Sequence, residues 1–224
     1  MIELTHDFPA VSCSGRRLYG GNQTLSSDRT MRGFGCGVIA GLDLLVYLCR
    51  YHGCRAEKLD ELVRADPIPW TTYDRCAQWL NRRFLPLIPG HGINGISLAV
   101  GLNAFFLRNG LRCRAKWGVS RDSFWPSMER MLWQDIPVIL SIGPNFPRFW
   151  QHNTLPFYQK NANGQYAKAT SICSHYVTVT GMDETWLQIS SWGRKFYISR
   201  REYEDYIHAH SLRLVSNILV LEHK

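Results

Sequence analysis

Three patterns are missing from this sequence, and each absence argues against one class of protein. No two of the seven cysteines form a CxxC pair, so a structural zinc site of the usual spacing is not expected. The longest apolar run, residues 38–49, is interrupted by Asp43 and is shorter than the roughly 18 residues of a membrane span. The basic residues form no long run, so the net charge of +8 indicates a solvated basic surface rather than specific nucleic-acid binding.

The cysteines and the N-terminus also bear on the compartment. The seven cysteines are spread from Cys13 to Cys173, which does not fit the disulfide framework of a small secreted domain. The first residues, MIELTHDFPAV, contain acidic side chains and no long apolar segment, so they do not resemble a signal peptide. We therefore expect free thiols, a cytoplasmic protein and no membrane span.

The sequence does contain enough apolar surface for a sizeable core. With 224 residues, of which 45% are hydrophobic and 12% aromatic, the chain suits one large domain. We expect a single domain over residues 1–224. Within it, residues 1–31 are expected to form a loop region with at most one short strand, 32–110 a mainly helical lobe and 111–224 a mainly β lobe.

The hydrophobic pattern changes along the chain from helical to alternating. From Gly37 the sequence GVIAGLDLLVYLCRYHG is apolar on nearly every side, which predicts a buried central helix that ends near His52. The order of the elements predicts an α+β fold, in which a helical lobe packs on a C-terminal antiparallel sheet. Further helices are expected at 56–66, 72–84, 97–110, 123–135 and 199–210, strands at 111–119, 136–143, 174–182, 185–193, 194–199 and 212–222, and a long loop or weak hairpin at 144–170.

Cys36 stands between two glycines in RGFGCGVIAGL, at the start of the predicted central helix. A thiol attacks a carbonyl well only as the thiolate, which a helix N-terminus and a neighbouring imidazole favour. Cys49 and Cys54 lie at the opposite end of that helix, where the dipole disfavours a thiolate. Cys36 is therefore the candidate nucleophile, and the alternative is a small apolar residue in a glycine-rich turn. Cys173, two residues before a histidine, is a lesser candidate.

His175 is the candidate general base, and it opens an alternating run, HYVTVTG. The following strand returns after a turn near Asp183, which lies too far along the strand to orient the imidazole. In such a hairpin Ser190 comes back roughly opposite position 175 or 176, so we expect its hydroxyl to meet the ring. Trp192 is expected to shield that contact from water. The alternatives are a hydrogen-bonded edge-strand histidine for His175 and a solvent-side or turn serine for Ser190.

Four segments, in this order, resemble the papain-like cysteine peptidases: RGFGCGVIAGLDLL, PVILSIG, SHYVTVTGMDETWLQISSWG and FYISRREYEDYI. They are most similar to the subgroup related to the bacteriocin-leader-processing (double-glycine) peptidases. The separation of 139 residues between Cys36 and His175 falls within the range of about 130–150 residues seen in papain-like enzymes. The resemblance covers residues 30–207 and implies a papain-like fold with Cys36 as nucleophile and His175 as general base. It also implies that Ser190 stands at the family's Asn position and that Trp192 is the shielding indole.

Two positions depart from the family's pattern. Six residues before Cys36, where the family has its oxyanion-hole glutamine, this chain has Thr30. Gln23 or Asn22 is then the candidate oxyanion donor, provided that the intervening loop bulges toward the site. Ser190 is shorter than the asparagine that it replaces and would orient the ring less well.

The resemblance implies acyl transfer through a thioester on Cys36, in the hydrolysis of a peptide or amide bond, with no cofactor or metal. The expected partner is thus a peptide or amide substrate. One alternative is a catalytically weak or inactive fold that serves as a binding or regulatory module, for which the departures at Thr30 and Ser190 would be traces of lost activity. A further alternative is an acyltransferase, in which the same Cys-His pair passes the acyl group to another amine.

Three other residues need an interpretation. His91, between glycines, and His152, in a loop, are candidates to line a cleft, with exposed loop positions as the alternative. Asp43 lies within the buried helix and needs an arginine or a backbone N–H as partner, because an unpaired buried carboxylate is costly. We interpret Asp43 as structural.

Overall fold

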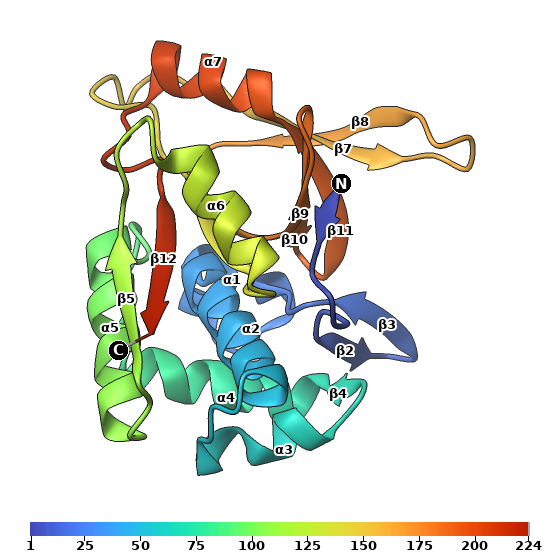
Figure 1. The fold of residues 1–224 in the computed structure, drawn as a ribbon, viewed down its shortest axis with the longest axis vertical. Helices are drawn as coiled ribbons and strands as arrows, with labels where there is room; N and C mark the ends of the chain where they lie inside the picture. The colour runs from blue at the N-terminus through green and yellow to red at the C-terminus, as the bar shows by residue number, and fades with distance from the viewer. Residues whose placement is uncertain (224) are drawn as a thin grey trace.

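The computed structural model describes residues 1–223 and confirms the α+β class (Figure 1). Most helices come from the first half of the chain, and the strands of the large sheet come mainly from the second half. The helices are α1 (Arg29–Phe34), α2 (Cys36–Tyr51), α3 (Asp60–Arg64), α4 (Trp70–Arg83), α5 (Gly95–Arg108), α6 (Phe124–Trp133) and α7 (Arg200–His210), with the short 3-10 helices η1 (Gln23–Leu25) and η2 (Glu57–Leu59).

The large sheet is antiparallel throughout, with strand order β5-β12-β6-β9-β10-β11-β7-β8 and with β1 added beside β9. Antiparallel neighbours β9, β10 and β11 follow one another along the chain as consecutive hairpins, which is the arrangement that alternating segments with short turns favour. The strands of this sheet are β1 (Ile2–Glu3), β5 (Cys113–Trp117), β6 (Val138–Ile142), β7 (Leu155–Lys160), β8 (Tyr166–Ile172), β9 (His175–Met182), β10 (Trp186–Ser191), β11 (Arg194–Ser199) and β12 (Ile218–His223).

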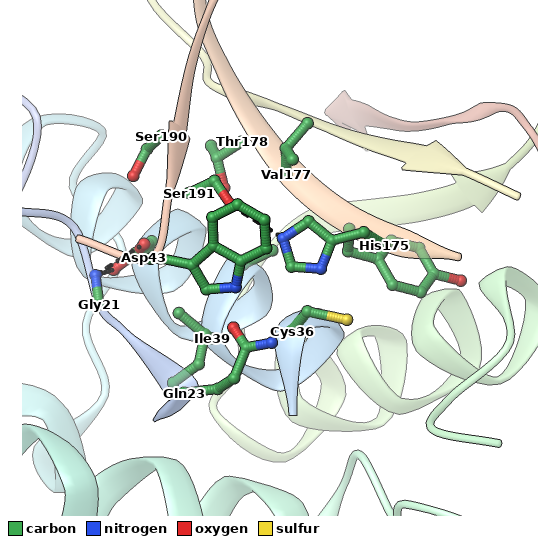
Figure 2. A pocket seen from close by; sticks show the side chains of 13 residues that line it. Gly21, Gln23, Cys36, Ile39, Asp43, His175, Val177, Thr178, Ser190 and Ser191 are labelled. Atoms are coloured by element: carbon green, nitrogen blue, oxygen red, sulfur yellow. Dashed lines mark hydrogen bonds between the residues drawn. The ribbon is translucent and has the colours of Figure 1, made fainter. Parts of the chain in front are cut away.

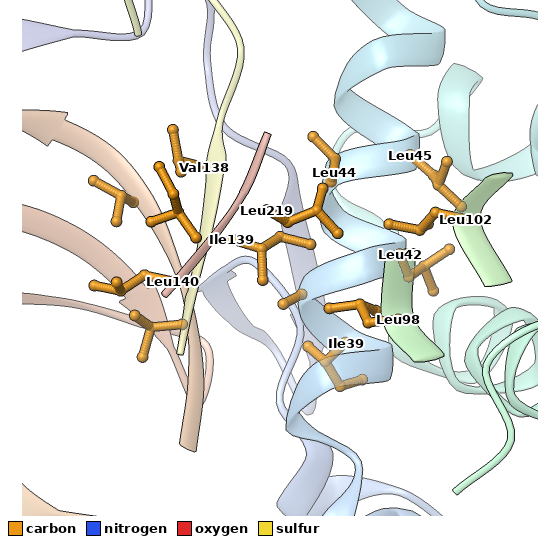
Figure 3. Close-up of a cluster of buried hydrophobic side chains, with 14 of the residues drawn as sticks. Ile39, Leu42, Leu44, Leu45, Leu98, Leu102, Val138, Ile139, Leu140 and Leu219 are labelled. Carbon is orange, nitrogen blue, oxygen red and sulfur yellow. The ribbon is translucent and has the colours of Figure 1, made fainter. Parts of the chain in front are cut away.

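Helix α2 lies between this sheet and helices α3, α4 and α5, and its residues from Gly37 to Leu48 are buried. Figure 3 shows Leu42 and Leu45 turned toward Leu98 and Leu102 of α5, while Leu44 faces the strands. Burial on all sides explains why the sequence of α2 shows no polar face. Each fully buried leucine contributes about 1.5–3 kcal/mol, so this helix is a rigid support for the residue at its N-terminus.

The prediction that residues 1–31 form a loop region with at most one short strand is wrong in part, because these residues contain three short strands and η1. Strand β1 pairs with β9, with Ile2 opposite Met182. Strands β2 (Ala10–Cys13) and β3 (Arg16–Tyr19) form a hairpin that β4 (Ile68–Pro69) extends into a small sheet. Strands of two to four residues carry too few alternations to be recognised from sequence, and β1 and β4 form only through pairing with distant segments.

Other boundaries differ in detail from the expected ones. The ambiguous segment 144–170 contains the hairpin of β7 and β8, which extends away from the body of the molecule (Figure 1). The helix expected at 56–66 is divided into η2 and α3, and it ends before Pro67 as the proline requires. The closing strand begins only at Ile218, because residues 212–217 form turns held by Ser211 and Ser216.

Among residues 1–223, no helix is long and apolar enough to cross a membrane. The seven cysteines are all free thiols.

Candidate active site

A small pocket opens where the N-terminus of α2 meets the first residue of β9 and the last residues of β10 (Figure 2). The cavity has a volume of about 10 Å³, which is room for about one water. The pocket is therefore nearly filled by its own side chains. Those that matter chemically are Gln23, Cys36, Asp43, His175, Ser191 and Trp192.

The glycines around Cys36 explain why the helix begins there. Gly35 is the N-cap of α2 and ends α1, and a Cβ on it would lie 2.5 Å from the carbonyl oxygen of Met31. A Cβ on Gly37 would lie 2.6 Å from Ile93 Cγ2. Side chains at either position would force the backbone or the neighbouring side chain to move, so the pattern GCG lets two helices and a loop meet at the cysteine.

His175 begins β9 and is 5% exposed. Its Nε2 lies 2.8 Å from Ser191 Oγ, and its ring stacks on the indole of Trp192 at a centroid distance of 4.6 Å. In Figure 2 the other ring nitrogen faces the side on which Cys36 lies. With Nε2–H donating to Ser191, Nδ1 is left unprotonated and can accept a proton from a thiol.

The expected contact of Ser190 with His175 is wrong, and Ser191 takes that place. Ser190 pairs with Thr178 in the β9–β10 ladder and donates its hydroxyl to the carbonyl oxygen of Tyr19 at 2.7 Å. The difference arises in the hairpin, which has three residues between its strands and a bulge between Gln188 and Ile189. A shift of the β10 register by one residue changes which side chain of β10 can reach the imidazole of His175.

The turn that carries Trp192 has an unusual backbone. Ser191 pairs with Arg194, so Trp192 and Gly193 form a two-residue hairpin turn, and both have positive φ, at 49° and 69°. A bulky residue with positive φ is rare and costs energy that its surroundings must offset. Here the conformation lays the indole over His175, which is consistent with the shielding role expected of Trp192.

Gln23 is brought to the pocket, whereas Asn22 and Thr30 are not among its lining residues. Gln23 is 7% exposed, begins η1 and lies beside Cys36 in Figure 2. The Asn22 side chain is used instead as an N-cap, since its Oδ1 accepts hydrogen bonds from Thr24 N at 3.0 Å and Thr24 Oγ1 at 2.8 Å. Thr30 lies on α1. Of the two candidates for an oxyanion donor, only Gln23 has its side chain available at the site.

The electrostatics of the site correspond to a neutral pair at rest. Burial raises the pKa of the Cys36 thiol, and hydrogen bonds from the backbone of Tyr176, Gly37 and Cys36 oppose that rise without cancelling it. Burial lowers the pKa of His175 to about 4. Although part of the Cys36 residue remains exposed, the dense protein around its sulfur outweighs the helix N-terminus, so the resting thiolate expected from the sequence is not favoured.

Asp43 is 2% exposed and lines the same pocket. Its partner is a backbone N–H, one of the two alternatives expected, because Gly21 N lies 3.1 and 3.2 Å from the two carboxylate oxygens. A second donor, not expected from the sequence, is Tyr73, whose hydroxyl lies 2.7 Å from Oδ1. Burial raises the pKa of Asp43 to about 7, against the lowering effect of these two hydrogen bonds.

The remaining candidates lie elsewhere. His91 and His152 are exposed loop residues, and neither they nor Cys173 line the pocket. Within residues 1–223 there is no group of three or more histidine, cysteine or acidic side chains arranged to hold a metal ion.

The comparisons with known proteins add no assignment: no protein-family model matches the chain, and no curated protein matches its sequence.

Proposed function

We propose that the chain is a papain-like cysteine peptidase or amidase that acts through a thioester on Cys36. The observation that carries the proposal is the shared pocket of Cys36 and His175, in which Ser191 and Trp192 fix the imidazole from two sides. A nucleophile, a base and a group that orients the base, all on rigid elements, are the parts that covalent acyl transfer requires.

In the first half of the reaction, His175 Nδ1 accepts the thiol proton while Cys36 Sγ attacks the substrate carbonyl carbon. The carbonyl oxygen becomes an oxyanion, for which Gln23 Nε2 and the Cys36 backbone N–H are the candidate donors. When the tetrahedral intermediate collapses, the C–N bond breaks and the imidazolium donates its proton to the leaving amine. The product is a thioester between the acyl group and Cys36.

In the second half, water attacks the thioester and His175 accepts one of its protons. The C–S bond breaks, and the proton returns to the sulfur, so the free carboxylic acid leaves a neutral pair behind. An amine in place of water would give acyl transfer by the same steps. Because the imidazole of His175 is neutral above about pH 4, its free nitrogen can accept a proton without a preformed ion pair.

A non-catalytic binding module is the second candidate, and two observations favour it. Burial raises the pKa of Cys36 and so reduces the thiolate available at neutral pH. Ser191 carries a hydroxyl, which can donate or accept, so it fixes the tautomer of His175 less firmly than a carboxylate or an amide oxygen would.

An activated ester separates the two candidates without knowledge of the substrate. p-Nitrophenyl acetate would acetylate Cys36 and release nitrophenol in a burst that is absent from Cys36→Ala. We expect the burst rate to rise through about pH 4, where His175 loses its proton. His175→Ala should remove this rise and slow acylation by about 10²–10⁴-fold. A rate that is unchanged in His175→Ala would support the binding module and contradict the enzyme.

A further inference from the structure

Asp43 is a buried carboxylate on the same helix as the nucleophile, seven residues beyond Cys36. Within residues 1–223, no lysine or arginine forms an ion pair with it. Its hydrogen-bond donors are the backbone N–H of Gly21 and the hydroxyl of Tyr73. A buried charge without a cation is costly, so this side chain is expected to have a use beyond holding the helix in place.

The segment that Asp43 holds, Gly20-Gly21, is packed so closely that neither residue has room for a side chain. A Cβ on Gly20 would lie 2.7 Å from Asp43 Oδ2 and 2.5 Å from Ser190 Oγ, and a Cβ on Gly21 would lie 2.3 Å from the Tyr73 hydroxyl. The Ser190 side chain is itself held in place, because its hydroxyl donates to the carbonyl oxygen of Tyr19. Groups from α2, α4 and β10 thus enclose the two glycines, and Gly20 adopts a φ of 77° that favours glycine.

Gln23 lies two residues after Gly21, and a second aspartate holds the chain beyond Gln23. Asp74 of α4 accepts hydrogen bonds from Ser26 Oγ at 2.6 Å and from Ser27 N at 3.0 Å. Gln23 therefore lies between two anchored points, with only the single turn of η1 to adjust its position. We therefore expect a small change at either anchor to alter the position of the Gln23 amide.

We propose that Asp43 is a positioning residue, whose ionised carboxylate holds Gly21 and thereby places the Gln23 amide as oxyanion donor at Cys36, and whose protonation releases it. This inference rests on the proposed function for the role of Gln23, but the link between Asp43, Gly21 and Gln23 stands on the contacts alone. Ionised, the carboxylate accepts from both donors; protonated, it has less capacity to accept them.

Asp43 changes its charge near neutral pH, because burial raises its pKa to about 7. The titratable groups around it are the hydroxyl of Tyr73 on α4 and, across the pocket, His175 on β9 and Cys36 on its own helix. Burial raises the pKa of Tyr73 and of Cys36 and lowers that of His175. These groups are therefore neutral near pH 7, and Asp43 is the one among them that changes charge there.

Amide NMR tests the link without any activity. In protein labelled with ¹⁵N-glycine and ¹⁵N-glutamine, we expect the Gly21 N–H and the Gln23 side-chain amide to shift with pH, with a common midpoint near 7. Asp43→Asn should abolish both titrations. Tyr73→Phe should keep them and raise the midpoint, because it removes a donor to the ionised form. Resonances of Gly21 and Gln23 that stay constant from about pH 5 to pH 9 in the unaltered protein would overturn the proposal.

The rate of acylation by p-nitrophenyl acetate is the second measurement. We expect a further rise near pH 7 in the unaltered protein, of about tenfold to a hundredfold, which is lost in Asp43→Asn and in Gln23→Ala. Asp135→Asn is the matched control, since Asp135 also accepts a backbone N–H and a tyrosine hydroxyl but lies outside the pocket. This variant should keep the rise.

The two ways of failing can be told apart. Acylation that lacks the rise near pH 7, or keeps it in Asp43→Asn, would contradict the positioning role and leave the nucleophile in place. If the burst is absent under all conditions, the proposed function fails, and the NMR titrations still decide whether Asp43 controls the position of Gln23.

Discussion

Helix α2 is tied to the N-terminal part of the chain by an aspartate at each of two places, and the two aspartates differ instructively. Asp43 accepts Gly21 N–H and the Tyr73 hydroxyl near the pocket. Asp135 accepts Thr5 N–H and the Tyr47 hydroxyl, both at 2.6 Å, near the opposite end of the helix. At both aspartates the donors include a backbone N–H and a tyrosine hydroxyl.

The surroundings of the two carboxylates set their pKa values in opposite directions. Burial raises the pKa of Asp43 to about 7. Burial also acts to raise the pKa of Asp135, but hydrogen bonds from Tyr47, His6 and the backbone outweigh it and lower the pKa. Asp135 keeps 13% of its side chain exposed and has His6 Nδ1 at 2.6 Å. The same pair of donors thus meets a carboxylate that stays ionised at neutral pH near the C-terminal end of α2, and one that titrates near pH 7 in the middle of the helix, beside the pocket.

Among the variants of residues that surround Cys36 and His175, Gln23→Ala is expected to lose the most acylation rate. Gln23→Ala should lower the acylation rate constant by about 10²–10³-fold with little change in KM, because the amide acts on the oxyanion of the transition state. Burst kinetics with p-nitrophenyl acetate measure this directly. Asn22→Ala is the control: it removes the cap of η1 and should lower stability by about 1 kcal/mol, with a smaller loss of rate. Equal losses of rate in the two variants would contradict a direct role for Gln23.

A smaller effect separates the two adjacent serines. Ser191→Ala removes the hydrogen bond to His175 Nε2, worth about 0.5–1.5 kcal/mol, and should slow acylation by up to about tenfold. Ser190→Ala instead leaves the carbonyl oxygen of Tyr19 without its donor and should mainly lower the free energy of unfolding. Urea titrations of both variants, beside their burst rates, check this. A greater loss of rate in Ser190→Ala would restore the original expectation for that residue.

The last prediction concerns the pH dependence of stability, whose sign differs between the two aspartates. The raised pKa of Asp43 means that the folded state binds its proton more tightly, so its contribution to stability falls as the pH rises from about 4 to about 7. The lowered pKa of Asp135 makes a contribution that is present above its usual pKa of 3.8 and is lost as the pH falls through the folded value.

The lowered pKa of His175 makes its contribution to the free energy of unfolding fall as the pH falls from 6.5 toward 4. This change partly masks the opposite effect of Asp43 in the unaltered protein. The informative quantity is therefore the difference in unfolding free energy between the unaltered protein and Asp43→Asn or Asp135→Asn, measured in urea at a series of pH values. The two differences should slope in opposite directions. Slopes of the same sign would show that burial does not distinguish the two aspartates.

How far the sequence predicts these features depends on whether the signal is local. The buried α2, with Cys36 at its start, follows from an apolar run preceded by glycines, and β9, with His175 at its start, follows from alternation. The sequence could not predict that Ser191, rather than Ser190, contacts His175. The register of β10 depends on the three-residue turn and on the bulge after Gln188. The adjacent serines of SSWG were the available signal that either could reach the ring.

The anchoring of Gln23 illustrates the other limit. The pattern GGNQ shows that the chain bends before Gln23, but the reason for the two glycines lies in Asp43 and Tyr73, more than twenty residues further along the sequence. Such close approaches depend on how α2 and α4 pack, which a local pattern does not report. For the same reason the raised pKa of Cys36 was missed, since burial of the sulfur is a property of the assembled pocket.

Peptide mapping of the acetylated protein compares the cysteines at the two ends of α2 and tests whether Cys36 is the nucleophile. After a short exposure to p-nitrophenyl acetate and acid quenching, mass spectrometry locates the acetyl thioester among the cysteines. We expect it on Cys36, which shares its pocket with His175, and not on Cys49, which does not line that pocket and whose pKa burial raises to about 12. The Cys36 thioester should be lost in His175→Ala. Equal labelling of Cys36 and Cys49, or labelling of Cys36 that does not depend on His175, would contradict a catalytic centre at the N-terminus of α2.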